Sequence, residues 1–304
     1  EEIKDRCELA RTIADSEFLK LVSIPKEKRT FVNTLTDLDR IGNITQVYAA
    51  PALFMSYVST DEKMRETALQ CEKDIEEYSI TISLRKDLYL AVKDYVEMKP
   101  TLNEKLTPED EKLLHDTLRD YKREGMELPS EILEKTKKIK IEISQIGVDF
   151  SKNVRESKAS IEADASELDG VPETSLKTFK KAENGKYIVT TDYPNYFPVM
   201  ENAKNEEVRK KMALLFLNRA SDKNLKLLDR LIKARHELAN LLGYKTFADY
   251  QIEIRMAKTS DRVKKFATGI SAQLIKKAKS DYKEALDLKI KDSNDPKATL
   301  NTWD

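Results

Sequence analysis

Apolar residues recur every three to four positions along most of this chain, a spacing that predicts a succession of amphipathic helices. In the stretch before Pro100 the apolar positions are Leu84, Leu88, Val92 and Tyr95, and charged residues lie between them. Pro100 predicts the end of this helix, because proline has no backbone N–H to continue the hydrogen-bonding pattern.

Two more helices are predicted after Pro100. The first begins at Thr107, whose hydroxyl can cap the free N–H groups, has Pro108 at its first position and runs to about Gly125. The second starts near Pro129 and carries one long apolar stripe, at Ile139, Ile143, Ile146, Phe150 and Val154. We expect these two helices to form an antiparallel hairpin.

The period of the pattern changes from about residue 159. Residues 159–163 and 186–191 alternate between apolar and polar side chains, and the turn pair Asn184-Gly185 precedes the second stretch. Such alternation predicts two short strands of a small sheet. We therefore divide the chain into a helical region, 1–155, and a strand-containing, then helical, region, 156–304. Residues 193–198 contain two prolines, so they predict neither regular helix nor central strand.

Helical spacing returns in three further segments before the chain ends. The second of them stops at Gly243, which favours a left-handed helix end, and the third starts near Ser260 and precedes a loop at 292–296. Their apolar positions are Val208, Met212, Leu215 and Phe216, then Leu225, Leu228, Ile232 and Ala239, then Val263, Phe266, Ile270, Leu274 and Leu286. The predicted fold class is mainly α, with stacked antiparallel helix hairpins and one small antiparallel β sheet.

The amino-acid composition supports a mainly α fold and limits the classes of partner that the chain could bind. The 304 residues include only 7 glycines, and 54 basic residues balance 54 acidic ones. A balanced charge gives no support for a nucleic-acid or membrane partner. No segment approaches the roughly 20 apolar residues that cross a bilayer; the most apolar run, 47–58, contains Pro51 and is interpreted as a buried helix start. The chain opens on Glu1 rather than Met, which leaves a removed leader or a fragment boundary open.

Two cysteines, Cys7 and Cys71, lie far apart in segments that have helical patterns. A disulfide-stapled secreted framework has more cysteines at closer spacing, so we expect both thiols to be free and reduced. Reduced thiols indicate a reducing compartment, and we expect the cytoplasm; a mitochondrial location as well is left open, because the chain does not open on Met.

One metal-like motif is present, His236-Glu237-Leu238-Ala239-Asn240. A zinc peptidase helix needs histidines at i and i+4 so that both imidazoles reach one ion, with the intervening glutamate as general base. Here Asn240 occupies the i+4 position, and the only other histidine is His115. We therefore expect His236 to be an ordinary helix residue.

Other candidate chemistry also has an ordinary explanation. His115 lies in a charged helix, Asp249 and Glu253 share a predicted helical face, and residues 137–140 form a basic run flanked by acids. Each is interpreted as a solvated surface feature. No serine lies in a glycine-flanked elbow and no glycine-rich phosphate loop exists. The sequence thus predicts no catalytic and no metal-binding residue in this chain, and it does not indicate substrate-binding residues.

Several motifs in the later half nevertheless resemble a known family. They follow the order and approximate spacing of the thimet oligopeptidase, neurolysin and saccharolysin family, specifically from about residue 125 and more loosely before it. The motifs are Leu168-Asp169-Gly170-Val171-Pro172-Glu173, Gly185-Lys186-Tyr187-Ile188-Val189-Thr190, Tyr193-Pro194-Asn195-Tyr196-Phe197-Pro198-Val199-Met200, Arg235 to Tyr244, Phe247-Ala248-Asp249-Tyr250, Arg255-Met256-Ala257 and Trp303-Asp304.

The resemblance implies a zinc endopeptidase that cleaves short peptides in a deep channel between two mostly helical domains. It implies one zinc ion, held by the histidines of an HExxH helix and a later glutamate, and a monomeric enzyme. None of these ligands can be assigned to a position in this sequence. We therefore expect this chain to be the amino-terminal half, to form part of the channel wall and to be inactive alone. The alternative is a non-catalytic helical module, descended from the peptidase, that binds peptides or proteins.

Overall fold

The computed structural model describes residues 1–304 and separates them into two compact units. Unit 1 comprises residues 1–149 and 229–250, and unit 2 comprises residues 150–228 and 251–304. Two long helices therefore contribute residues to both units. The domain boundary predicted after residue 155 stays a prediction.

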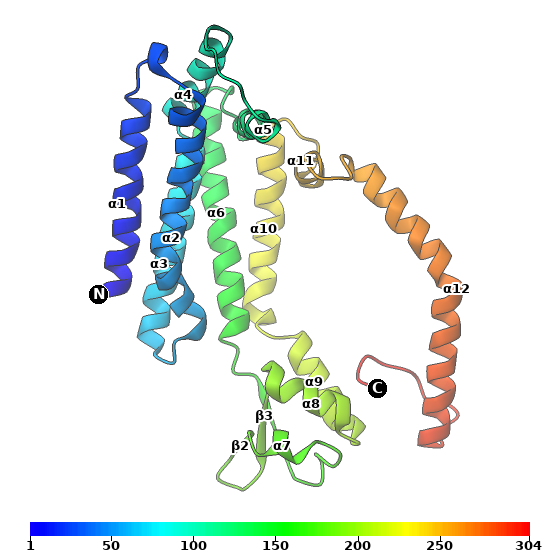
Figure 1. Ribbon diagram of the computed structural model, residues 1–304. Coiled ribbons are helices and arrows are strands. Elements are labelled where there is room, and N and C mark those ends of the chain that lie inside the picture. The colour runs from blue at the N-terminus through cyan, green and yellow to red at the C-terminus, as the bar shows by residue number, and fades with distance from the viewer. The chain divides into compact units, whose positions relative to one another are not determined.

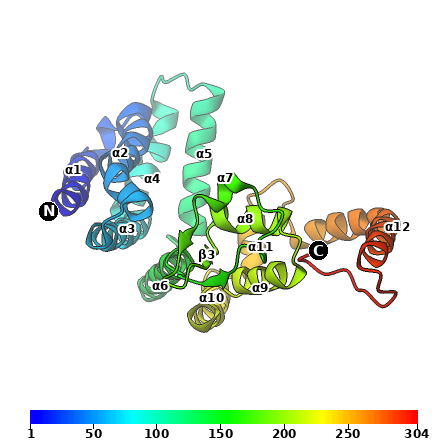
Figure 2. The ribbon, with the colours of Figure 1, turned by 90° about the horizontal axis from the view of Figure 1, so that it is seen from below.

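Unit 1 is built from helices. Its first three long helices run antiparallel, side by side, in the views of both Figure 1 and Figure 2. The helices that contribute to this unit are α1 (Glu2–Val22), α2 (Asp37–Val58), α3 (Glu62–Ser83), α4 (Lys86–Met98), α5 (Pro108–Arg123), α6 (Ser130–Arg155), α10 (Ser221–Leu241) and α11 (Phe247–Ile252), together with the short helical turns η1 (Lys26–Lys28), η2 (Val32–Thr36) and η3 (Lys99–Thr101).

The most apolar run of the sequence forms the second half of α2. It is not the buried helix start that we expected, because Val47 is 69% exposed and Phe54 is 58% exposed. The buried side of this half-helix consists of small residues instead, at Ala49, Ala52 and Ser56. Small side chains allow α2 to approach α1 and α3 closely, while its larger apolar groups face outward.

Helix α5 begins as its sequence predicts. The Thr107 hydroxyl accepts a hydrogen bond from the backbone N–H of Asp110 (3.2 Å), and the Asp110 carboxylate accepts one from the N–H of Thr107 (2.9 Å). The predicted hairpin with α6 is wrong, however, because α5 lies across the view in Figure 2 while α6 is seen nearly end-on. The centre of the Tyr121 ring on α5 lies 5.5 Å from that of the Tyr89 ring on α4, so the apolar face of α5 packs against α4 and not against α6.

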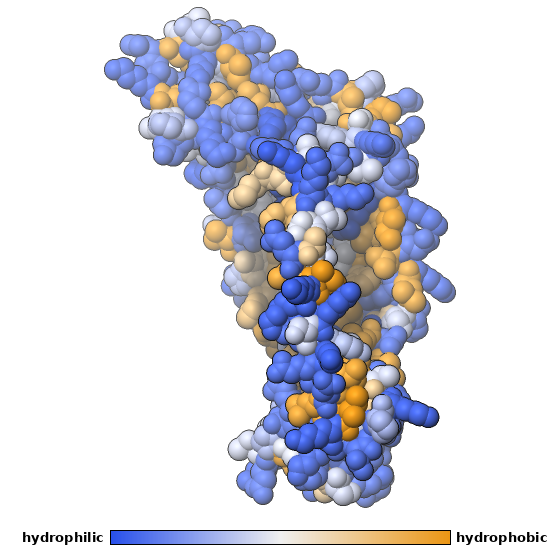
Figure 3. Space-filling model, turned by 90° about the vertical axis from the view of Figure 1, so that its right-hand side faces the viewer, coloured by the Kyte–Doolittle hydropathy of each residue, from blue (hydrophilic) through white to orange (hydrophobic).

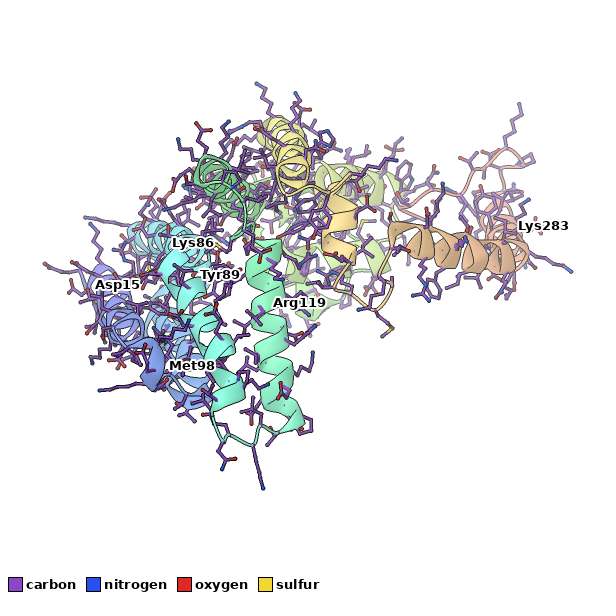
Figure 4. All side chains as sticks on the ribbon, turned by 90° about the horizontal axis from the view of Figure 1, so that it is seen from above. Asp15, Lys86, Tyr89, Met98, Arg119 and Lys283 are labelled. Atoms are coloured by element: carbon purple, nitrogen blue, oxygen red, sulfur yellow. A yellow bond between two sulfur atoms is a disulfide. The ribbon has the colours of Figure 1, made fainter.

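The largest buried core lies around α4. Tyr89 and Tyr95 are at most 2% exposed, and each hydroxyl donates to a carboxylate, Tyr89 to Glu127 (2.9 Å) and Tyr95 to Glu104 (3.0 Å). Figure 4 shows Tyr89 on α4, next to α5. Buried phenols need such partners, since an unpaired hydroxyl in an apolar core destabilises the fold.

A disulfide joins Cys7 on α1 to Cys71 on α3, with 64 residues of sequence separation and 6.1 Å between the Cα atoms. The expectation of two free thiols is therefore wrong. Sequence spacing could not reveal the pair, because α2 reverses the chain and returns α3 to the side of α1. Both cysteines are buried in a small core formed largely by alanines.

Unit 2 contains the only sheet, with strands β1 (Ser160–Ala163), β2 (Lys180–Lys181) and β3 (Tyr187–Thr190). The strands are antiparallel in the order β1-β3-β2, and Ile161 pairs with Val189. Both predicted strands are confirmed, and β2 is an addition that two consecutive lysines gave no reason to expect. The helices α7 (Glu173–Leu176), α8 (Tyr193–Asn202) and α9 (Glu206–Leu217) accompany the sheet. A buried core that includes Val189, Val199 and Met212 joins the sheet to α8 and α9.

Helix α8 contradicts one sequence prediction. Residues 193–198 were expected not to be regular helix, yet α8 starts at Tyr193 and contains both Pro194 and Pro198. Pro194 lies in the first turn, where no N–H is required, and the N–H groups of Asn195 and Tyr196 bond the carbonyl of Asp192. Pro198 has no N–H and so removes one hydrogen bond of the helix, and the next residue, Val199, is fully buried.

The last helix, α12 (Ser260–Ser293), is continuous over 34 residues and contains no buried residue. Its apolar positions match the predicted helix; Val263, Phe266, Ile270 and Leu274 are exposed, and Leu286 is half-buried. Figure 3 shows apolar patches among hydrophilic side chains on the face that carries this helix. No helix in residues 1–304 combines the length and the apolar character needed to cross a bilayer.

Candidate functional site

The metal-like motif lies on α10, and its first and last side chains contact each other. His236 Nε2 is 3.0 Å from the side-chain nitrogen of Asn240, one turn along the helix, and both side chains are exposed. Asn240 thus fills the position that a second histidine ligand would need. Within residues 1–304 no three His, Cys, Asp or Glu side chains gather closely enough to hold a metal ion. The described residues therefore do not fit zinc, and the location of the metal site stays a prediction.

His115 takes part in a surface ion-pair network on α5. Its Nδ1 lies 3.2 Å from the carboxylate of Asp116, which also bonds Lys112 and Arg119 at 2.6 Å each. Hydrogen bonds from Lys112 and His115 hold the pKa of Asp116 low, at about 2. The arrangement gives His115 a charged neighbour but no nucleophile to activate.

Asp249 and Glu253 do not share the helical face predicted for them. Helix α11 ends at Ile252, one residue before Glu253. The Thr246 hydroxyl donates to the Asp249 carboxylate at 2.7 Å, and the Asp249 N–H returns a bond to that hydroxyl at 3.1 Å. Asp249 therefore belongs to the turn that begins α11.

A half-buried ionic cluster in unit 1 was not predicted from the sequence. Lys140, expected on a solvated face, bonds the carboxylate of Glu124 and is only 16% exposed. Burial, and to a lesser extent the nearby Arg123 guanidinium, lower the pKa of Lys140 to about 8. The assignment of Lys140 to the surface is thus wrong, because α6 turns this lysine toward the end of α5.

Two tyrosines of the resemblance motifs complete this cluster. Arg123 donates to the hydroxyl of Tyr244 (3.2 Å) and to the backbone carbonyl of Tyr250, and its guanidinium lies 4.6 Å from the centre of the Tyr250 ring. The two tyrosine rings are 5.1 Å apart, edge to face. Through Tyr244 and Tyr250, the two motifs around the loop between α10 and α11 are therefore attached to Arg123 at the end of α5.

The motif at residues 193–200 builds an aromatic cluster on α8 and α9. Tyr196 stacks on Phe216 with 4.0 Å between ring centres, and Arg219 covers the Phe216 ring at 3.7 Å. Tyr193 and Phe197 join the same cluster but remain 61% and 43% exposed. The cluster presents aromatic surface to solvent and contains no acid–base pair.

The terminal Trp-Asp pair packs on α9. The Trp303 indole N–H donates to Glu206 (3.3 Å), and Arg209 donates to the Trp303 carbonyl (2.7 Å). Lys289 bridges the carboxylates of Asp304 (2.5 Å) and Glu206 (2.9 Å). These contacts attach the last residues of the chain to α9 and to the end of α12, within unit 2.

Comparison with known proteins agrees with these motifs. Residues 199–304 match the sequence model of Peptidase family M3. The chain is 31% identical over 294 residues to a thimet-like oligopeptidase of Dictyostelium discoideum, covering 96% of this chain and 44% of that protein. It is 32% identical over 245 residues to saccharolysin of Saccharomyces cerevisiae, covering 79% and 34%. Oligopeptidase A of Escherichia coli is 28% identical over 259 residues, with 80% and 38% covered.

The chain thus spans less than half the length of each of these relatives. The resemblance found in its sequence motifs is confirmed: the chain is a relative of the thimet-type oligopeptidases and matches Peptidase family M3 over residues 199–304.

Proposed function

We propose that this chain is the amino-terminal, helical part of a zinc metalloendopeptidase that hydrolyses short peptides. The observation that carries the proposal is the 31% identity along 96% of the chain to a thimet-like oligopeptidase. The other relatives described above are peptidases by name as well. Their greater length supports a catalytic part formed by further sequence.

The role assigned to this chain is architectural. Zinc, when bound to such an enzyme, polarises the scissile carbonyl and lowers the pKa of its water. The side chains described here do not form its ligand set, so no chemical step is assigned to them. The function of this part is to form a wall of a channel between two mostly helical domains, which admits flexible short peptides and excludes folded proteins.

The remaining properties follow from the same proposal. The substrates are short peptides, and balanced charge supports neither a nucleic-acid nor a membrane partner. The enzyme acts as a monomer in the cytoplasm or a mitochondrial compartment. The Cys7–Cys71 disulfide is unusual for such compartments, so its oxidation state in cells tests the location directly.

Reading the gene across the codon for Asp304 tests the proposal. We expect an open frame that continues into an HExxH motif and a later glutamate, the ligand spacing of a zinc peptidase. A stop codon directly after Asp304 would refute the catalytic assignment. The alternative, a non-catalytic binding module, would then be the function to pursue.

A further inference from the structure

The two halves of α1 are attached to the rest of unit 1 by different amounts of apolar surface. In the second half, Phe18 and Leu21 are only 2% and 3% exposed and belong to the largest core of the unit. In the first half, Cys7 and Ala10 are the buried residues, and the small core around them consists mainly of alanines and the two cysteines. Such small side chains remove little apolar surface from water, so the apolar contacts of residues 2–12 are weak.

The polar contacts of α1 with other helices are also confined to its second half. Tyr78 of α3 donates a hydrogen bond to Asp15, which Figure 4 labels on α1 (2.8 Å). Arg40 of α2 pairs with Glu17 (3.0 Å). The side chains of residues 1–12 form no hydrogen bond or ion pair with another helix, and their one ion pair lies within α1. The disulfide to α3 is therefore the main attachment of the first half of the helix.

A pocket of about 440 Å³ opens onto this disulfide. Its volume lies within the range of about 300–1,000 Å³ that is typical of sites for small molecules. Both cysteines line the pocket, and so do charged side chains that form no ion pair, the bases Lys4 and Arg11 and the acids Glu8 and Glu66. A zwitterionic thiol such as glutathione carries carboxylates and an ammonium group, which these bases and acids complement.

We propose that the Cys7–Cys71 disulfide is a redox latch, that a small zwitterionic thiol opens it from this pocket, and that opening releases residues 2–12 of α1 from α3. Residues 14–22 stay packed, because the large core and the polar contacts of the second half hold them. Whether the latch is closed or open follows the ratio of disulfide to thiol around the protein. A helix end with few tertiary contacts frays in water, so reduction changes the local order of α1. The inference does not rest on the proposed peptidase function.

Opening the latch consumes two molecules of the small thiol. The first, as its thiolate, attacks one protein sulfur and forms a mixed disulfide, while the other protein sulfur leaves as a thiolate and takes up a proton. A second thiolate attacks the sulfur of the bound small molecule. The small molecule then leaves as its disulfide dimer, and the remaining protein sulfur takes up a proton. Two small thiols are thus oxidised and one protein disulfide is reduced, and the reverse steps close the latch.

Hydrogen exchange of the 304-residue chain in glutathione buffers tests the release of the helix. We expect reduced glutathione to speed exchange at residues 5–12 roughly tenfold more than at residues 14–22, and oxidised glutathione to reverse the change. Cys7→Ala/Cys71→Ala should exchange as the reduced chain does in both buffers. The control Tyr78→Phe removes a bond to the second half of α1 and should leave residues 5–12 protected in the oxidised buffer. Equal acceleration of both halves, no acceleration at residues 5–12, or failure of glutathione to reduce the bond overturns the proposal.

The rate of reduction tests the role of the pocket. Lys4→Glu/Arg11→Glu should slow reduction by glutathione roughly tenfold, because it reverses the charges that attract the carboxylates. It should not slow reduction by β-mercaptoethanol, whose only ionisable group is its thiol. The control Lys135→Glu/Lys138→Glu reverses two exposed, unpaired lysines of α6 and should be reduced by both thiols as the parent is. Equal slowing with the two thiols, or no slowing with glutathione, overturns the proposal that the thiol acts from this pocket. No outcome depends on peptidase activity, so the proposed function is tested separately.

Discussion

Reduction of the Cys7–Cys71 disulfide should destabilise unit 1 strongly and unit 2 hardly at all. The bond closes a loop that spans α1 to α3 with a sequence separation of 64 residues. The chain-entropy relation for a loop of this length gives about 4 kcal/mol of stabilisation at 25 °C. A single domain is typically stable by only about 5–15 kcal/mol, so this loss is large.

The reductant has a route to the bond. An open pocket of about 440 Å³, lined by both cysteines and by charged side chains of α1 and α3, lies next to the disulfide. A small thiol can enter a pocket of this volume. Reduction leaves every side chain in place, so it isolates the effect of the cross-link better than substitution does.

The single tryptophan makes the experiment internally controlled. Trp303 belongs to unit 2, and its fluorescence follows that unit alone. Hydrogen exchange measured on peptides from α1 and α3 follows unit 1. With dithiothreitol we expect the backbone amides of α1 and α3 to exchange faster and these helices to unfold at a lower urea concentration. The urea midpoint of the Trp303 fluorescence transition should not change. Equal unfolding of oxidised and reduced protein, or free thiols in the native oxidised protein, would refute the reasoning.

Three further substitutions test local features of the fold. Gly170 has φ = +96°, and a Cβ there would overlap the carbonyl oxygen of Asn202. Gly170→Ala should therefore lower the free energy of unfolding by about 2–4 kcal/mol, measured by Trp303 fluorescence in urea. The control Gly185→Ala, at φ = +85° with no atom within 4 Å of the added Cβ, should lower it by about 1 kcal/mol, and equal losses would contradict the overlap. Thr107→Ala removes the cap of α5 and should lower stability by about 1 kcal/mol in urea unfolding followed by circular dichroism, whereas an unchanged midpoint would show that the cap contributes nothing. The pKa of Asp116 is about 2 in the folded state against 3.8 in the unfolded state, so its contribution to folding stability is full above pH 3.8 and is lost as the pH falls toward 2. Asp116→Asn should remove this part of the pH dependence of stability, and an NMR titration of Asp116 with a midpoint near 3.8 would disprove the ion-pair network.

Local sequence signals predicted the helices and strands well where the decisive interaction is local. The Thr107 cap, the left-handed stop at Gly243 (φ = +85°) and the alternation in β1 and β3 each depend on neighbouring residues. The failures have a different origin. Whether α5 packs on α6 or on α4, and whether Lys140 faces water or Glu124, is decided by segments that are distant in the sequence.

The resemblance motifs show what sequence alone could not assign. Gly170, Tyr244, Tyr250 and Trp303 were recognised as family-like without a physical reason. The structure supplies one for each: a close backbone contact at Gly170, the Arg123 cluster for both tyrosines, and attachment to Glu206 and Arg209 for the tryptophan. The contacts that these four residues make are therefore structural ones within the fold.

The measurement that tests the central claim most directly is zinc-dependent hydrolysis of a quenched fluorescent peptide. It compares the 304-residue chain with the protein made from the intact gene, each with and without a zinc chelator. The account predicts turnover by the longer protein, loss of that turnover with the chelator, and none by the 304 residues alone. Chelator-sensitive turnover by the pure 304-residue chain, or none by the longer protein, would contradict it.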